Sequence, residues 1–250
     1  MKVVKVCEIC GKPKRVITDL LGLEINCACD CDIKAREEAE KIRAALDRMA
    51  AVQEFKDASL LGDRFAEVEF ETTDVGGSKS FDDAFRRCAA YCAAADKVFD
   101  NGYGIYIYGE NGTGKTHLAA CIVNELARQL RTVIFTNLAE IAKMAIRDEK
   151  KFERACAVDF LVIDDLGAER MKNADGEDLW AQECIYNFIN KRYIYKLPTI
   201  FTSNYSLADL VNECGMARRT VDRIAEMSNA VLKISGASRR LRKKNGDLPF

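Results

Sequence analysis

The chain has 250 residues, 48% of them apolar, and a formal net charge of −1, which fits a globular protein with one α/β core and a small accessory module. The near-zero net charge excludes a global electrostatic field that would draw the whole protein to nucleic acid. No stretch has the length of a membrane span and the first residues lack the apolar region of a signal peptide, so we expect a cytoplasmic protein without membrane contact.

Five of the eleven cysteines lie within the first 31 residues, at spacings typical of metal ligands. Cys7 and Cys10 form a Cys-x2-Cys pair followed by glycine, which predicts a turn whose two thiolates face one tetrahedral ion. A later group, Cys27, Cys29 and Cys31, offers three thiols where two are needed. We therefore predict a zinc site made by Cys7, Cys10, Cys27 and either Cys29 or Cys31. A redox dithiol, unstructured thiols and an iron–sulfur cluster remain alternatives.

Between these two groups, residues 16–18 and 23–25 are predicted to form a hairpin that turns at Leu21-Gly22. The other six cysteines occupy apolar positions and are predicted to be small core residues, since buried cysteine commonly behaves as a hydrophobe. They are Cys88, Cys92, Cys121, Cys156, Cys184 and Cys214.

Residues 33–56 are predicted to form an amphipathic helix, because four apolar side chains share one stripe: Ile42, Leu46, Met49 and Val52. The stripe could cover the metal module, the main domain or a partner, and packing in the core is the default expectation. Turn-forming residues follow at 74–80, and a helical pattern resumes at Phe81. We predict a partner-binding module at 1–57, a linker at 58–80 and the main domain at 81–250.

Residues 109–116 match the phosphate-binding P-loop pattern, and their surroundings fit it. The run Ile105–Tyr108 suits a buried strand, and Leu118, Ile122, Leu126 and Leu130 recur afterwards at helical spacing. Glycines allow backbone N–H groups to surround phosphate oxygens at the positive end of the new helix. We predict that Lys115 reaches the β- and γ-phosphates of ATP and that Thr116 binds Mg²⁺. The predicted nucleotide contacts are Gly109, Glu110, Asn111, Gly112, Thr113, Gly114, Lys115, Thr116 and His117.

Two later strands end in polar residues. Phe160–Ile163 precedes Asp164 and Asp165, which predicts a Walker B element in which Asp164 holds Mg²⁺ through water and Asp165 polarises the attacking water. The strand at 198–202 precedes Asn204, whose carboxamide can hydrogen-bond that water or the γ-phosphate. An Asp-Asp turn and a simple turn asparagine are the structural alternatives.

The C-terminal segment is basic. From Arg218 to Lys244 there are nine Lys or Arg and two acidic residues, spread over a predicted helix and a last strand at 230–235. Arginine suits bidentate contact with a γ-phosphate, so one of these residues could complete its own nucleotide site and another a neighbour's. A plain basic face is the alternative.

From about residue 60 to 242 the sequence resembles bacterial and phage DnaC/DnaI-type helicase loaders of the AAA+ class, which are closely related to the IstB transposition ATPases. The resemblance lies in residues 62–65, 114–119, 163–167, 190–193, 202–204 and 238–240. It implies an α/β fold with a five-stranded parallel sheet, here near 105–108, 132–136, 159–163, 199–202 and 230–235, preceded by the zinc module and its helix.

The resemblance also assigns roles to residues. Asn204 becomes the first sensor, Arg223 an arginine finger that acts on a neighbouring subunit, with Arg219 as a weaker candidate, and Arg240 the second sensor. The family has an aromatic residue where this chain has Arg239, which leaves the register between positions 239 and 240 open. His117 is expected to pack or cap rather than to act in catalysis.

The function implied is ATP-promoted assembly into an oligomer on single-stranded DNA, with the N-terminal module bound to a hexameric replicative helicase. An IstB-like helper of a DNA transposase, which binds duplex DNA, is the nearest alternative. A zinc adaptor that uses ATP only as a conformational switch is another.

Overall fold

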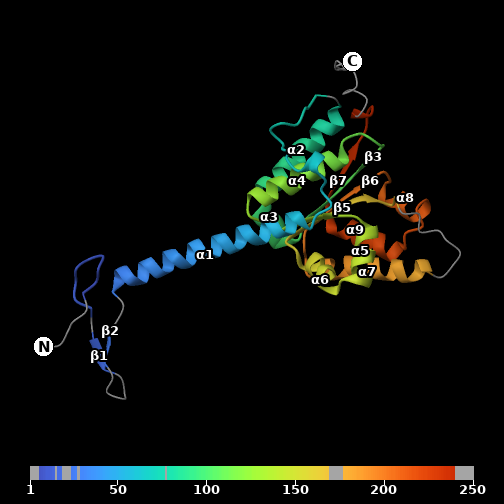
Figure 1. The fold of residues 1–250 in the computed structure, drawn as a ribbon. Coiled ribbons are helices and arrows are strands. Elements are labelled where there is room, and N and C mark those ends of the chain that lie inside the picture. The colour runs from blue at the N-terminus through green and yellow to red at the C-terminus, as the bar shows by residue number, and fades with distance from the viewer. Residues whose placement is uncertain are drawn as a thin grey trace, which may run out of the picture. The chain divides into compact units, whose positions relative to one another are not determined.

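The computed structural model describes residues 6–14, 16–18, 24–26, 29–76, 78–168 and 177–239. The chain divides into two compact units, Met1–Ala51 and Val52–Phe250, and the helix α1 (Asp30–Asp57) has residues in both (Figure 1). The predicted division into a partner-binding module, a linker and a main domain stays a prediction. No helix in the described ranges is long and apolar enough to cross a membrane.

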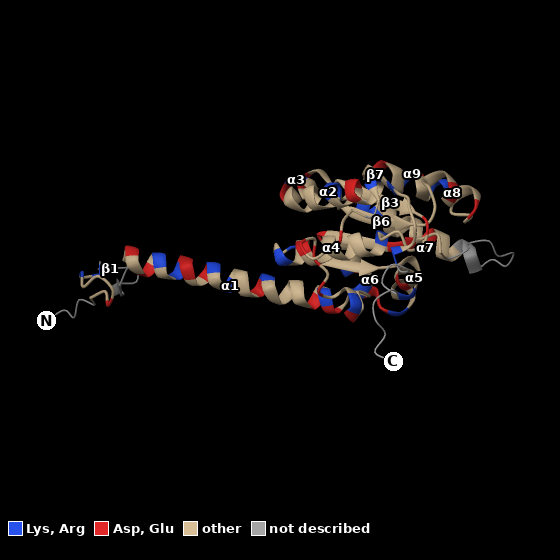
Figure 2. Ribbon diagram, turned by 90° about the horizontal axis from the view of Figure 1, so that it is seen from above, with Lys and Arg blue, Asp and Glu red and all other residues tan. Residues whose placement is uncertain are grey.

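The first unit contains the predicted hairpin. Strands β1 (Val16–Thr18) and β2 (Glu24–Asn26) pair antiparallel, and the predicted turn at residues 21–22 lies outside the described residues. Acidic and basic side chains alternate along α1 (Figure 2). Of its apolar stripe, Val52 is buried, but Ile42, Leu46 and Met49 are 54%, 60% and 54% exposed, so the expectation that the whole stripe packs in a core was wrong.

The second unit is built on the predicted parallel sheet. Its strands are β3 (Gly104–Gly109), β4 (Val133–Thr136), β5 (Phe160–Leu166), β6 (Thr199–Ser203) and β7 (Ser228–Ile234). They run in the order β4-β5-β6-β3-β7, with every neighbouring pair parallel. Apolar side chains cover both faces of the strands, which is typical of a parallel sheet between helices. The carboxyl ends of β3, β5 and β6 meet at one edge, where ligands bind in such sheets.

Helices cover the two faces of the sheet (Figure 1). On one face lie α2 (Lys79–Ala93), α3 (Ala95–Asn101) and α4 (Lys115–Arg128). The other face holds α5 (Leu138–Arg147), α6 (Glu149–Ala157), α7 (Glu177–Ile194), α8 (Leu207–Asn212) and α9 (Arg218–Met227). Each face of the sheet packs against its helices in a separate hydrophobic core. The side chains of a strand alternate between these two cores, because successive residues point to opposite faces.

Five of the six cysteines outside the N-terminal group are buried as predicted, and Cys184 is half-buried.

The prediction that Leu130 lies on the helix after the P-loop was wrong. α4 ends at Arg128, and Leu130 has a left-handed φ of 59° and is 38% exposed. Such a residue commonly closes the last turn of a helix, so the apolar spacing continued past the real end of α4.

The segment before α2 belongs to the second unit and is hydrogen-bonded to its α4 and β4. It includes the 3₁₀ helix Asp63–Phe65, and the side chain of Asn124 in α4 donates hydrogen bonds to the carbonyls of Phe65 at 2.9 Å and Val68 at 2.8 Å. The backbone N–H of Leu60 donates to the carbonyl of Phe135 in β4 at 2.8 Å. The predicted linker therefore contains a length of chain that packs on α4 and β4.

Arg192 is fully buried near the amino ends of β5 and β6, where its guanidinium hydrogen-bonds to both segments. Its guanidinium donates to four backbone carbonyls and to Thr199 Oγ1 at 3.0 Å. The carbonyls are those of Ala155, Cys156, Val158 and Pro198. These contacts join the end of α6 to the start of β6 and hold the two strands that position the acidic residues described next.

Candidate functional site

The P-loop connects β3 to α4 as predicted, and its conformation requires glycine. Gly112 and Gly114 have φ values of 78° and 108°, and a Cβ added at Gly112 would lie 2.2 Å from Ser238 Oγ. Lys115, which is 6% exposed, donates from Nζ to the carbonyls of Gly109 and Glu110 at 2.9 Å each and to Asn204 Oδ1 at 2.8 Å. The lysine ammonium therefore lies inside the loop and reaches the end of β6.

The end of β5 brings Asp164 to the start of α4, beside Thr202 of β6. Thr116 Oγ1 lies 3.2 Å from both carboxylate oxygens of Asp164, and Thr202 Oγ1 donates a further hydrogen bond to the same carboxylate. Burial raises the pKa of Asp164, while the hydroxyl groups of Thr202 and Thr116 act in the opposite direction. A hydroxyl and a carboxylate at this separation are hard oxygen donors that fit adjacent positions around Mg²⁺.

Asp165 and Asn204 form a second pair beside the lysine. Asp165 has a left-handed φ of 56°, and its backbone N–H donates to Thr202 Oγ1 at 2.9 Å. Its carboxylate accepts a hydrogen bond from Asn204 Nδ2 at 3.0 Å. Because the other end of the same amide accepts from Lys115, Asn204 links the P-loop lysine to the Walker B element. Thr202, whose hydroxyl contacts both acidic residues, belongs to the motif at residues 202–204, but the sequence alone assigned it no role in the site.

The segment after β7 lies against the P-loop. The backbone N–H of Arg239 donates to the carbonyl of Gly112 at 2.8 Å, and its guanidinium lies 4.0 Å from the centroid of the Phe81 ring. The same guanidinium pairs with Asp74 at 3.8 Å. Arg239 thus stacks on an aromatic ring at the position where the resemblance expects an aromatic residue. Arg240, the predicted second sensor, lies outside the described residues, so its role stays a prediction.

His117 joins α4 to the segment before α2. Its Nε2 atom lies 2.9 Å from Thr73 Oγ1, and that hydroxyl donates to the carbonyl of Glu69 at 2.6 Å. These contacts are of the packing kind expected for His117.

The structure does not bring the two predicted intersubunit arginines to the P-loop of their own chain. Both lie on α9 against α7: Arg219 over the ring of Tyr186 at 4.3 Å and Arg223 over the ring of Tyr193 at 4.4 Å. Arg223 also pairs with Glu226 at 3.0 Å. α7 and α9 cover the sheet face opposite the one that α4 covers.

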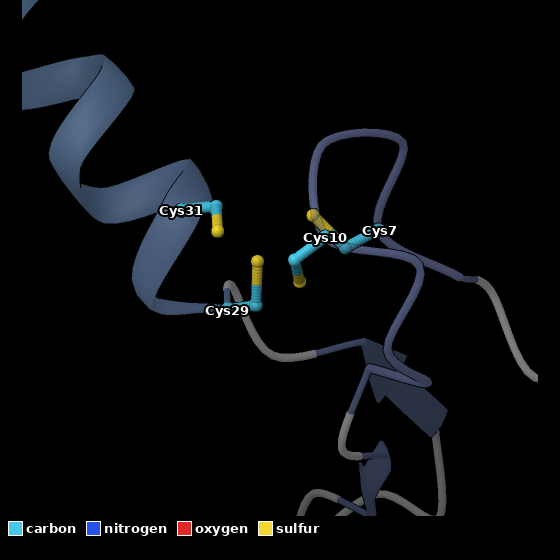
Figure 3. Close-up of side chains that lie close together, drawn as sticks. All are labelled: Cys7, Cys10, Cys29 and Cys31. Carbon is cyan, nitrogen blue, oxygen red and sulfur yellow. The ribbon is translucent and has the colours of Figure 1, made fainter.

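The first unit contains a cluster of four cysteines. The sulfur atoms of Cys7, Cys10, Cys29 and Cys31 lie within 4.8 Å of one another, the first two from one loop and the others from the start of α1 (Figure 3). Tetrahedral zinc with bonds of about 2.3 Å separates its sulfur ligands by about 3.8 Å, so the cluster fits this ion. Cys27 lies outside the described residues, and the four described thiols are enough without it.

The loop around Cys7 favours a thiolate. Gly11, with a φ of 67°, donates from its backbone N–H to the carbonyl of Cys7 at 2.9 Å and closes the turn. The backbone N–H of Cys10, together with a hydrogen bond from Cys29 and the N–H of Ile9, lowers the pKa of Cys7 to about 7. Since the thiolate is the form that binds metals, this turn is suited to a metal ligand.

Comparisons with known proteins show which family and relatives the chain is similar to. The family model described as IstB-like ATP binding protein matches residues 79–246. The replicative helicase loader DnaI of Bacillus subtilis is 27% identical over 228 residues, covering 84% of this chain and 68% of DnaI. The phage-like element PBSX protein XkdC of the same organism is 28% identical over 233 residues, covering 88% of this chain and 79% of XkdC.

A solved structure has the same fold. The crystal structure of the DnaC helicase loader superimposes with a TM-score of 0.57 and 26% identity, over 70% of this chain and 100% of that one. The similarity therefore extends over the P-loop, the acidic pair and Asn204, all of which lie in the second unit.

Proposed function

Because the chain belongs to the family of IstB-like ATP-binding proteins, we propose that it is an AAA+ ATPase that loads a hexameric replicative helicase onto single-stranded DNA. The observation that carries the proposal is the meeting of Lys115, Asp164 and Asn204 at one edge of the sheet, in a chain similar to two proteins named as helicase loaders. The resemblance noted in the sequence points to the same group.

Each residue of the site has a separate proposed role in ATP hydrolysis. Bound ATP and Mg²⁺ supply the phosphoryl group and the charge that balances it in the transition state. Lys115 would bind phosphate oxygens in place of its present carbonyl acceptors, and Thr116 with Asp164 would hold the metal. Asp165, next to Asn204, orients the attacking water and accepts its proton. Aspartate is one methylene shorter than the glutamate usual in such ATPases, so hydrolysis by the isolated protein should be slow.

The first unit is the proposed site for the helicase. On α1, Ile42, Leu46 and Met49 form an exposed apolar stripe. Acidic and basic residues alternate along the same helix (Figure 2). The described part of α1 mixes acidic and basic residues, so it presents no surface of one charge sign. Apolar contact is therefore the interaction that this surface favours.

A single glutamate on α1 tests this assignment. Leu46→Glu should abolish capture of a hexameric replicative helicase from the same cells and leave ATP binding unchanged. Ala44→Glu adds the same charge to the same helix about half a turn away from the stripe, and should still capture helicase. Affinity purification with purified helicase measures both. Equal capture by the two variants would place the helicase surface elsewhere.

Single-stranded DNA is the proposed nucleic-acid partner. The basic segment from Arg218 to Lys244 supports phosphate contacts, so the affinity should fall steeply with salt and be higher with ATP than with ADP. An IstB-like transposase helper is the second candidate, which the family match itself favours. Preference for duplex over single-stranded DNA in a binding titration would decide for the helper.

We predict that the protein, purified under reducing conditions, contains one zinc ion per chain held by Cys7, Cys10, Cys29 and Cys31. Replacing Cys7 and Cys10 together with serine should remove the zinc, while Cys184→Ser, on α7, should retain it. Cys27→Ser should also retain it, because the described four thiols complete the site. Elemental analysis measures the metal. Iron in place of zinc, or loss of zinc in Cys27→Ser, would contradict this ligand set.

A further inference from the structure

Two arginines of α9 lie on two tyrosines of α7 in a repeated arrangement. Arg219 and Arg223 are four residues apart and therefore share one face of α9, and Tyr186 and Tyr193 are seven apart and share one face of α7. Each guanidinium lies over one ring, at 4.3 Å and 4.4 Å from the ring centroids. The two helices thus present both arginines side by side on aromatic supports.

Arg223 is held from a second side. Its Nη1 atom donates to the Glu226 carboxylate at 3.0 Å. The neighbouring Glu226 raises the pKa of Tyr193, and Tyr193 lowers the pKa of Glu226. The ring and the carboxylate therefore fix the guanidinium in two directions, while about a third of the Arg223 side chain stays exposed.

Stacking on a ring suits an arginine that must bind phosphate. The ring contacts the flat face of the guanidinium and uses none of its five N–H donors, and the bond to Glu226 uses Nη1. The remaining edge has the planar geometry that matches two phosphate oxygens. An arginine without such support samples many rotamers and reaches a phosphate less often.

We propose that Tyr193 is a positioning residue that holds the Arg223 guanidinium in the conformation needed to reach the nucleotide of a second copy of this chain. Tyr186 does the same for Arg219. This inference rests on the proposed ATPase function and on the action of Arg223 on a neighbouring subunit, which the sequence resemblance implies.

Substitutions of Tyr193 separate the ring from the hydroxyl. In the full-length protein, Tyr193→Leu should lower the rate of ATP hydrolysis at saturating ATP about fivefold, the factor that corresponds to roughly 1 kcal/mol for one exposed cation–π contact. The KM for ATP should not change, because the substituted residue is far from its own P-loop in the fold. Tyr193→Phe keeps the ring and should stay within about twofold of the wild type. Tyr195→Leu is the matched control, an exposed tyrosine just beyond α7.

Two further measurements distinguish positioning from a general effect on folding. In the double variant Tyr193→Leu with Arg223→Ala, the rate of ATP hydrolysis should equal that of Arg223→Ala alone. The Tyr193 ring can act only through the Arg223 guanidinium, which this variant lacks. Mixing Tyr193→Leu subunits with Asp165→Asn subunits, which keep Arg223 and its support, should restore part of the lost activity.

The outcomes separate this inference from the proposed function. If Arg223→Ala itself hydrolyses ATP normally, the intersubunit role of Arg223 is wrong. If Arg223→Ala is impaired but Tyr193→Leu hydrolyses ATP at the rate of Tyr195→Leu, Tyr193 does not position the arginine. The same conclusion follows if Tyr193→Leu lowers the rate by the same factor when it is added to Arg223→Ala. Equal losses in Tyr193→Phe and Tyr193→Leu would also overturn the inference.

Discussion

Arg223→Ala should bind ATP as the wild type does and hydrolyse it about 10³-fold or more slowly, because an arginine supplied to a neighbour's site contributes about 10³–10⁵ in rate. The guanidinium lies on α9 against α7, so its loss leaves the P-loop of the same chain intact. Binding of a fluorescent ATP analogue and release of phosphate measure the two quantities. Arg218→Ala, the exposed arginine that begins α9, serves as the control and should retain activity.

A mixture of variants tests whether Arg223 acts between subunits. Arg223→Ala subunits have intact nucleotide sites, and Asp165→Asn subunits have an intact Arg223 but a disabled site. Together they should hydrolyse ATP faster than either alone, with a maximum at an intermediate ratio. A rate that is only the weighted average at every ratio would mean that Arg223 acts within its own chain or has no part in hydrolysis.

Lys115→Ala should abolish ATP hydrolysis and weaken ATP binding at least about tenfold, because it removes the cation that faces the β- and γ-phosphates. The buried ammonium also connects Gly109, Glu110 and Asn204 in the present structure, so thermal unfolding without nucleotide should accompany the assay. Lys143→Ala removes an exposed lysine of α5 and is the matched control. Turnover by Lys115→Ala at the rate of this control would disprove the nucleotide site.

The main elements of the second unit could be predicted because their signals are local. Each strand is a short run of apolar and β-branched residues, and the five observed strands lie within two residues of the expected ones except at the end of β5. The P-loop has fixed spacing, and its lysine follows from that spacing alone. Asp164, Asp165 and Asn204 could be placed near it because the carboxyl ends of parallel strands meet at one edge.

Other features depend on contacts between distant parts of the chain, and no local pattern predicts them. Thr202 is part of the motif at residues 202–204, but its role could not be predicted, because only the register of β5 and β6 brings its hydroxyl to Asp164. The burial of Arg192 depends on backbone carbonyls from two separate segments, residues 155–158 and Pro198. The stripe on α1 has the same period whether it faces a core or solvent, which is why the exposure of Leu46 was not foreseen.

The hydrogen bond from the Arg239 N–H to the Gly112 carbonyl connects the chain just before its basic residues Arg240, Arg242, Lys243 and Lys244 to the loop that would surround phosphate. If those residues hold DNA, the two ligands are thermodynamically linked: any factor by which ATP tightens DNA binding must equal the factor by which DNA tightens ATP binding. DNA would then act as the signal that keeps the nucleotide in place, and release of either ligand would favour release of the other.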